Sequence, residues 1–262
     1  MKKTQAGSVA ALILGIAIAG FPGTTGAEPT TWDALEEECR ETGIDPKLTK
    51  DLIGRCREAG VDLEGTCLML AHAQEAAGDG LPCQPIMEKI AEGVGKGIPP
   101  ATIAEVARQR VRLLRTAREM VRGTEDERAA DVAVVAAAQA MESGLEEDAA
   151  RSVIEAGRNE RPHDLAALLE AGEALYLAGF ASDEIPPIIT DCLNRRLNRV
   201  ELRRAVRYAA QQKQRGMETG KIRQALWGGE GSAPQNRHRE QSGQGGAAGP
   251  GAGGPHHGHG RP

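Results

Sequence analysis

The sequence predicts an all-α fold, in which antiparallel helical hairpins form an α-solenoid-like array or a compact bundle. Only six of the 262 residues are aromatic, whereas β-sheets draw heavily on aromatic and β-branched side chains. Apolar residues recur at helical spacing, and no stretch sustains the two-residue alternation of a half-buried strand. A glycine followed by an apolar residue marks each expected helix end, at Gly43, Gly60, Gly80, Gly97, Gly144, Gly179 and Gly216.

The first 27 residues have the three-part order of a secretory signal peptide. Lys2 and Lys3 precede an apolar run from Val9 to Phe21, and small residues follow up to Ala27. The run is about 13 residues long, shorter than the roughly 20 that cross a bilayer as a helix. We expect cleavage after Ala27 and export from a bacterial cell, to the periplasm or beyond, with no transmembrane span left after cleavage. The alternative is an uncleaved membrane anchor.

Residues 28–122 are expected to form a first region of helical-hairpin repeats. Gly43 and Gly80 lie 37 residues apart, as do Gly60 and Gly97, so a repeat unit contains two helices and two turns. Residue types that begin helices follow these turns, at Asp45-Pro46, Asp62, Pro82 and Pro99-Pro100. A longer helix is expected near residues 101–122.

Residues 123–227 are expected to form a second helical region, because the repeat period fails between Gly97 and Gly144. A long helix is expected near residues 125–143. Thr124 with Glu127, and Asn198 with Glu201, have the spacing of a capping box at two helix starts. A single continuous array remains the alternative to two packed halves.

The stretch that begins Gly80-Leu-Pro-Cys and ends near Val121 contains the pattern GLPxxPxxxKxxEGxxKGxPPxxI. In this pattern it resembles exported bacterial helical-repeat proteins that have no known activity. The resemblance covers residues 80–121 and implies an all-α fold and export, and it supplies no catalytic residues.

Residues 228–262 change abruptly to Gly, Pro, Gln, Ser and His. Such a segment cannot bury enough apolar surface to offset its ordering entropy, so we expect a disordered tail. Within it, the imidazoles of His256, His257 and His259 could bind a divalent transition metal. The alternative, which we favour, is a solvated spacer.

Five cysteines in an exported protein point first to disulfides. Cys56 and Cys67 lie at matched distances from the turn at Gly60, and Cys39 and Cys83 lie near turns expected at one end of the array. The predicted bridges are therefore Cys56–Cys67 and Cys39–Cys83, with Cys192 left over as a thiol. The alternative is that all are buried reduced thiols.

The net charge is −5, yet residues 194–223 contain ten basic residues against two acidic ones. Arg199, Arg203, Arg204 and Arg207 are the candidates for contact with an anionic partner. Because export removes nucleic acid as the default partner, such a partner would be an anionic envelope polymer. The alternative, which we favour, is that the basic block is a solvated helix face that complements the acidic middle of the chain.

No nucleophile-elbow, zinc-protease, P-loop or dinucleotide-binding motif occurs in the sequence. We therefore predict a non-enzymatic binding or scaffold protein of the cell envelope without a cofactor, whose partner is an envelope protein or an anionic envelope polymer. The alternative function is that of a metal-handling protein that uses the histidine-rich tail.

Overall fold

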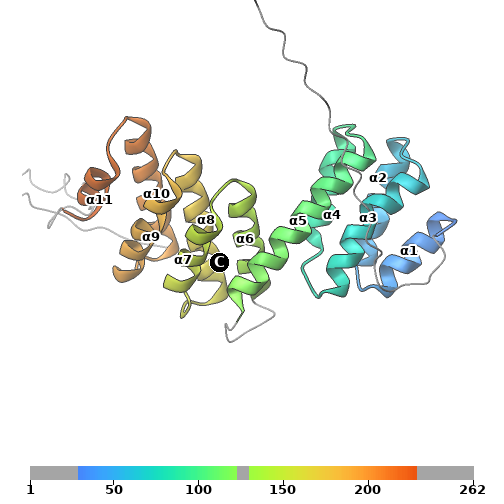
Figure 1. The fold of residues 1–262 in the computed structure, drawn as a ribbon, viewed down its shortest axis with the longest axis horizontal. Helices are drawn as coiled ribbons and strands as arrows, with labels where there is room; N and C mark the ends of the chain where they lie inside the picture. Colours follow the sequence, from blue (N-terminus) through green and yellow to red (C-terminus); the bar gives the residue numbers. More distant parts are fainter. Residues whose placement is uncertain (1–28, 123–129, 229–262) are drawn as a thin grey trace, which may run out of the picture. The chain divides into compact units, whose positions relative to one another are not determined.

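The computed structural model describes residues 29–122 and 130–228, and within them every regular element is helical (Figure 1). The elements are α1 (Trp32–Glu41), α2 (Pro46–Glu58), α3 (Leu63–Gly78), α4 (Gln84–Gly95), α5 (Pro100–Val121), α6 (Ala130–Glu142), α7 (Glu147–Ala156), α8 (Pro162–Leu177), the 3-10 turn η1 (Ser182–Glu184), α9 (Ile185–Asn194), α10 (Arg199–Gln214) and α11 (Thr219–Trp227). The predicted all-α class is confirmed for these residues. None of the described helices is long and apolar enough to span a membrane.

Three expectations lie outside the described residues. They are the signal peptide of residues 1–27, the capping box of Thr124 and Glu127, and the tail that carries His256, His257 and His259.

The seven predicted glycine turns are confirmed. Each of these glycines has a positive φ, between 66° and 106°, which a residue with a Cβ adopts only at a cost. The apolar residue after each glycine donates its N–H back into the helix, as Ile44 does to the Cys39 carbonyl at 3.0 Å and Phe180 to the Leu175 carbonyl at 3.2 Å. These bonds are those of a Schellman motif and close the helix ends that the sequence marks.

Side-chain caps set the starts of α1, α2, α3 and α10. Asp45 Oδ1 accepts a hydrogen bond from the N–H of Lys47 at 2.7 Å, and Asp62 Oδ1 accepts one from Gly65 at 2.8 Å. Asn198 and Glu201 form the predicted capping box of α10, because each side chain accepts a hydrogen bond from the backbone N–H of the other.

One helix end was not expected from the sequence. Arg196 has a φ of 53°, and the N–H of Leu197 donates to the Cys192 carbonyl at 3.3 Å. This is the same closing bond as at the glycines, but the residue with the positive φ here is an arginine, whose Cβ makes that conformation costly. Turn spacing based on glycine alone therefore misses the boundary between α9 and α10.

The described residues divide by their contacts into two compact units, and the division between Arg112 and Leu113 lies inside α5. In the first unit, α1 packs on α3 and α2 packs on α4, in addition to the contacts of α1 with α2 and α3 with α4. Leu35, Ile53, Met69 and Ile86 are among its fully buried side chains. Helices two places apart in the chain are therefore neighbours.

The second unit has the same order of contacts. Helix α8 packs on α6 and α10, and α7 packs on α9, so that α6, α8 and α10 follow one another along the unit (Figure 1). The contact between α6 and α8 is the most extensive, and the buried side chains of α6 are six alanines and Val134. Small side chains let the two helices approach closely over this length.

Candidate functional site

Helix α10 separates an apolar inner face from a basic outer one. Its buried side chains are Leu202, Val206, Ala209 and Gln212. Arg199, Arg203, Arg204 and Arg207 are all exposed on the other side. Because residues four apart lie on one side of a helix, these four side chains form one surface, which we call the arginine face.

Three of the four arginines have no partner among the described residues. Arg199 Nε donates to Asp164 Oδ1 at 3.0 Å, but no hydrogen bond, ion pair or ring contact within residues 29–122 and 130–228 involves Arg203, Arg204 or Arg207. Among these four arginines, the alternative expectation, neutralisation of the acidic middle of the chain, is thus met only by Arg199 within these ranges.

Other members of the basic block are used inside the second unit. Lys213 Nζ bonds to Glu184 Oε2 at 2.8 Å, Arg223 Nε bonds to Asp191 Oδ2 at 2.9 Å, and the guanidinium of Arg195 lies 4.7 Å from the centre of the Trp227 ring. These contacts tie α9, α10 and α11 together. The basic residues of the segment 194–223 therefore include some that form structural contacts, as well as the three arginines of α10 that have no partner among the described residues.

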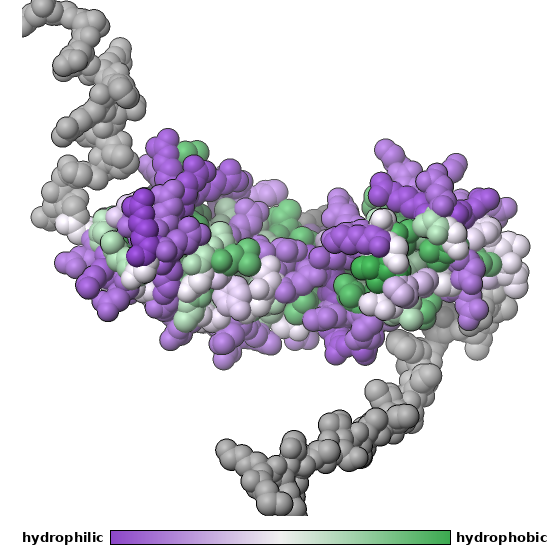
Figure 2. All heavy atoms as spheres, turned by 90° about the horizontal axis from the view of Figure 1, so that it is seen from above, coloured by the Kyte–Doolittle hydropathy of each residue, from purple (hydrophilic) through white to green (hydrophobic). Residues whose placement is uncertain are grey.

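Large apolar side chains are seldom exposed in the described part of the chain, and apolar residues form separate patches on a largely hydrophilic surface (Figure 2). Val200 and Tyr208, 59% and 37% exposed, are two of the exceptions, and both belong to α10. The arginine face thus offers apolar contact beside its charges.

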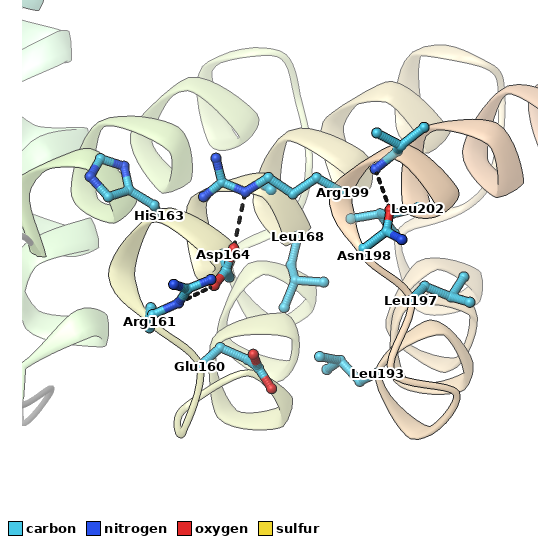
Figure 3. Close-up of a pocket in the computed structure, with 12 residues that line it drawn as sticks. Glu160, Arg161, His163, Asp164, Leu168, Leu193, Leu197, Asn198, Arg199 and Leu202 are labelled. Atoms are coloured by element: carbon cyan, nitrogen blue, oxygen red, sulfur yellow. Dashed lines mark hydrogen bonds and ion pairs between the residues drawn. The ribbon is translucent and has the colours of Figure 1, made fainter.

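A cleft of about 980 Å³ lies where the start of α8 faces the connection between α9 and α10 (Figure 3). In Figure 3, Arg161, Asp164 and Arg199 form one side and Leu193 and Leu197 the other. The lining residues are Glu160, Arg161, His163, Asp164, Ala167, Leu168, Leu193, Leu197, Asn198, Arg199, Val200 and Leu202. The cleft is therefore amphipathic.

Asp164 holds two arginines at the charged side of the cleft. Arg161 Nε donates to Asp164 Oδ2 at 2.7 Å, and Arg199 Nε donates to Oδ1 at 3.0 Å. Burial raises the pKa of Asp164, but the hydrogen bonds from the two arginines outweigh this effect and hold the pKa below its ordinary value. The carboxylate is ionised at neutral pH and fixes both guanidinium groups.

Sequence reasoning missed this cleft and its residues Arg161, Asp164, Leu193 and Leu197. The signal that could have found them is the separation of Asp164 and Arg199, which is 35 residues and thus close to the repeat length of 37. Residues one repeat apart occupy equivalent places on neighbouring helices of an array.

Neither predicted disulfide is present in the structure. Gln74 Nε2 donates to Cys39 Sγ at 3.6 Å, and Cys83 Sγ donates to the Ala73 carbonyl at 3.5 Å, so both sulfurs contact α3 as thiols. Likewise, Cys56 and Cys67 are not joined. Equal distance from a turn sets two residues at one height, but it does not fix the direction in which each side chain leaves its helix.

Cys192 is a buried thiol. Burial, and next the charge of Asp191, raise its pKa to about 12, although Arg195 acts in the opposite direction. A thiol with this pKa is almost fully protonated at neutral pH and is a poor nucleophile.

No cluster of His, Cys, Asp or Glu suited to a metal ion occurs among the described residues. The metal-handling alternative depends on His256, His257 and His259, which lie outside them. It therefore gains no support from the described part of the chain.

In comparisons with known proteins, the chain matches no protein-family model, no curated relative and no solved structure. The resemblance of residues 80–121 to exported helical-repeat proteins thus stays an expectation from the sequence.

Proposed function

We propose that this chain is an exported, non-enzymatic binding protein of the bacterial cell envelope, which holds an anionic polymer on the arginine face of α10. The observation that carries the proposal is the exposure of Arg203, Arg204 and Arg207 without a partner among the described residues. Export is inferred from the signal-peptide pattern that ends at Ala27.

An α-solenoid-like arrangement of helical hairpins is part of the proposal. Its support is that long-range side-chain hydrogen bonds join residues about one repeat apart. Pairs of this kind are Cys39–Gln74, Ser143–Glu173, Glu146–Ser182, Asp164–Arg199, Glu184–Thr219 and Asp191–Trp227, with separations of 30 to 36 residues. In a solenoid each repeat contacts its neighbours, which produces separations of this size.

The chemistry of the arginine face suits repeated phosphate or carboxylate groups. A guanidinium group donates two parallel hydrogen bonds to such an oxyanion, so a polymer can be held without a deep pocket. Arg203 and Arg207 lie one helical turn apart, and Arg204 lies beside Arg203. Attraction between exposed charges is screened over about 8 Å at physiological salt, so this binding must depend strongly on ionic strength.

The test measures the anisotropy of two labelled polymers, long-chain polyphosphate and poly-glutamate, as protein is added at low and at high salt. The triple variant R203E/R204E/R207E should lose binding, and the wild-type affinity should fall steeply as salt rises. The matched control is K47E/K50E/R55E, which makes the same change in charge at exposed positions of α2 and should bind nearly as the wild type does.

Three outcomes would overturn the proposal. They are an affinity that is independent of salt, an equal loss in the α2 control, and binding to anionic phospholipid vesicles but to neither polymer. Circular dichroism of all variants checks that the helices are intact.

A further inference from the structure

We infer that the cleft between the start of α8 and the α9–α10 connection is a peptide-binding site, which takes an extended segment with an acidic side chain next to apolar ones. The inference rests on the proposed binding function, but it concerns a separate surface that shares only Arg199 with the arginine face.

The charged side of the cleft is a prearranged receptor for one carboxylate. Arg161 and Arg199 each bond to Asp164 through Nε, and no contact of their terminal Nη groups occurs within the described residues. Their side chains are 87% and 48% exposed. Because Asp164 already restrains both long side chains, less conformational entropy is lost when a ligand binds to them.

The apolar side of the cleft offers surface that a ligand can cover. Leu193 and Leu197 are only half-buried. Leu168 and Leu202, both 5% exposed, extend this apolar lining. An apolar side chain placed here would remove leucine surface from water, which favours binding in proportion to the area covered.

The acidic residues of the lining select against a continuous polyanion. Asp164 compensates one of the two guanidinium charges, and the carboxylate of Glu160 points toward Leu193 instead of toward Asp164 (Figure 3). A second anionic group close to the first would meet Glu160. A single carboxylate flanked by apolar side chains avoids this repulsion, and Glu160 can accept a backbone N–H of the bound segment. This pattern fits a peptide better than a phosphate polymer.

The volume supports the same conclusion. Sites that enclose small ligands typically range from about 300 to 1,000 Å³, and this cleft, at about 980 Å³, is at the upper end. It can accept several residues of an extended chain.

The test uses a labelled peptide with blocked ends, Gly-Leu-Asp-Leu-Gly, and two variants in which Asp becomes Asn or both Leu become Ala. Binding is followed by fluorescence anisotropy up to millimolar protein. We expect the parent peptide to bind and each variant to bind about tenfold more weakly, the cost of losing a charge-assisted hydrogen bond or the apolar contacts.

Protein variants locate the site. R161A should weaken peptide binding about tenfold, since it removes one of the two guanidinium groups. A167E should abolish binding, because it places a carboxylate in the cleft. R158A removes a neighbouring exposed arginine that does not line the cleft, and it should have no effect.

Failure of this inference differs from failure of the proposed function. R161A should leave polyphosphate binding unchanged, and R203E/R204E/R207E should leave peptide binding unchanged, whereas R199A should weaken both. The inference is overturned if no peptide binds, if the Asn peptide binds as well as the Asp peptide, or if R158A and R161A behave alike. Polymer binding would stand in each of these cases.

Discussion

Lys213 Nζ donates a hydrogen bond to Glu184 Oε2 at 2.8 Å, and this contact joins α10 to the η1 turn. Thr219 at the start of α11 donates to the other carboxylate oxygen at 2.6 Å, and the N–H of Ala181 also donates to Glu184. Burial raises the pKa of Glu184, but these hydrogen bonds outweigh it and lower the pKa to about 2. The ionised carboxylate therefore joins η1, α10 and α11 of the second unit.

The first prediction concerns stability against acid. Because the pKa of Glu184 is lower in the folded state than its ordinary 4.5, its contribution is complete above about pH 5 and is lost as the pH falls toward 2. Glu184→Gln should lower the free energy of unfolding at pH 7 by about 1 kcal/mol, allowing for partial exposure to solvent. The substitution should also flatten the dependence of the free energy of unfolding on pH. Urea unfolding at pH 7, 5 and 3 measures both effects, with Glu170→Gln, at an exposed position, as the control. The prediction is contradicted if the free energy of unfolding depends on pH equally in the wild type and in both variants.

The second prediction concerns the helix end at Arg196. A residue with a side chain is strained at a positive φ, so Arg196→Gly should raise the free energy of unfolding by about 0.5 kcal/mol. Gly179→Ala is the reverse change at an equivalent turn. No atom lies within 4 Å of the added Cβ there, so its expected cost of about 1 kcal/mol is purely a backbone effect. Denaturation midpoints should shift in opposite directions, and a shift in the same direction would refute the argument.

The third prediction compares two glycines inside helices. A Cβ at Gly93 would lie 2.7 Å from Ile103 Cγ1, so Gly93→Ala should destabilise the protein by about 1–3 kcal/mol. At Gly172 the nearest atom is Ile185 Cγ2 at 3.5 Å, an ordinary contact. Gly172→Ala should therefore stabilise the protein by up to about 1 kcal/mol, because alanine favours the helix. Thermal melts of the two variants should lie on opposite sides of the wild type.

The fourth prediction concerns thiol reactivity. Burial is the main cause that raises the pKa of Cys39 to about 12, as it does for Cys192. Neither thiol should react with iodoacetamide within minutes at pH 8 in the folded protein, and both should react at once in guanidinium chloride. Peptide mapping identifies the labelled positions. Rapid labelling of Cys192 in the native state would show that its burial is not maintained in solution.

Local features of the fold could be read from the sequence because their causes are local. The glycine turns and the Asn198–Glu201 capping box depend on residues a few positions apart, and the structure confirms them. The end at Arg196 escaped because an arginine takes the positive φ there, so that no glycine marks the turn in the sequence.

Contacts between helices were harder to predict. The disulfide pairings used height along a helix alone, whereas the sulfurs of Cys39 and Cys83 contact Gln74 and Ala73 of α3 as thiols. The four arginines of α10 were found because they are dense in the sequence. The cleft was not found, because its charged side combines Arg161 and Asp164 with a residue one repeat further on, Arg199.

The one-repeat separation of the long-range hydrogen bonds has a consequence for the order of folding. Asp164 meets Arg199 after 35 residues, and Glu184 meets Lys213 after 29, so each contact needs only the next two helices. Contacts of short sequence separation cost little loop-closure entropy and form quickly. A chain that emerges from a ribosome with its N-terminus first can therefore form each of these hydrogen bonds once the next two helices have emerged, and these bonds need not wait for the last residues.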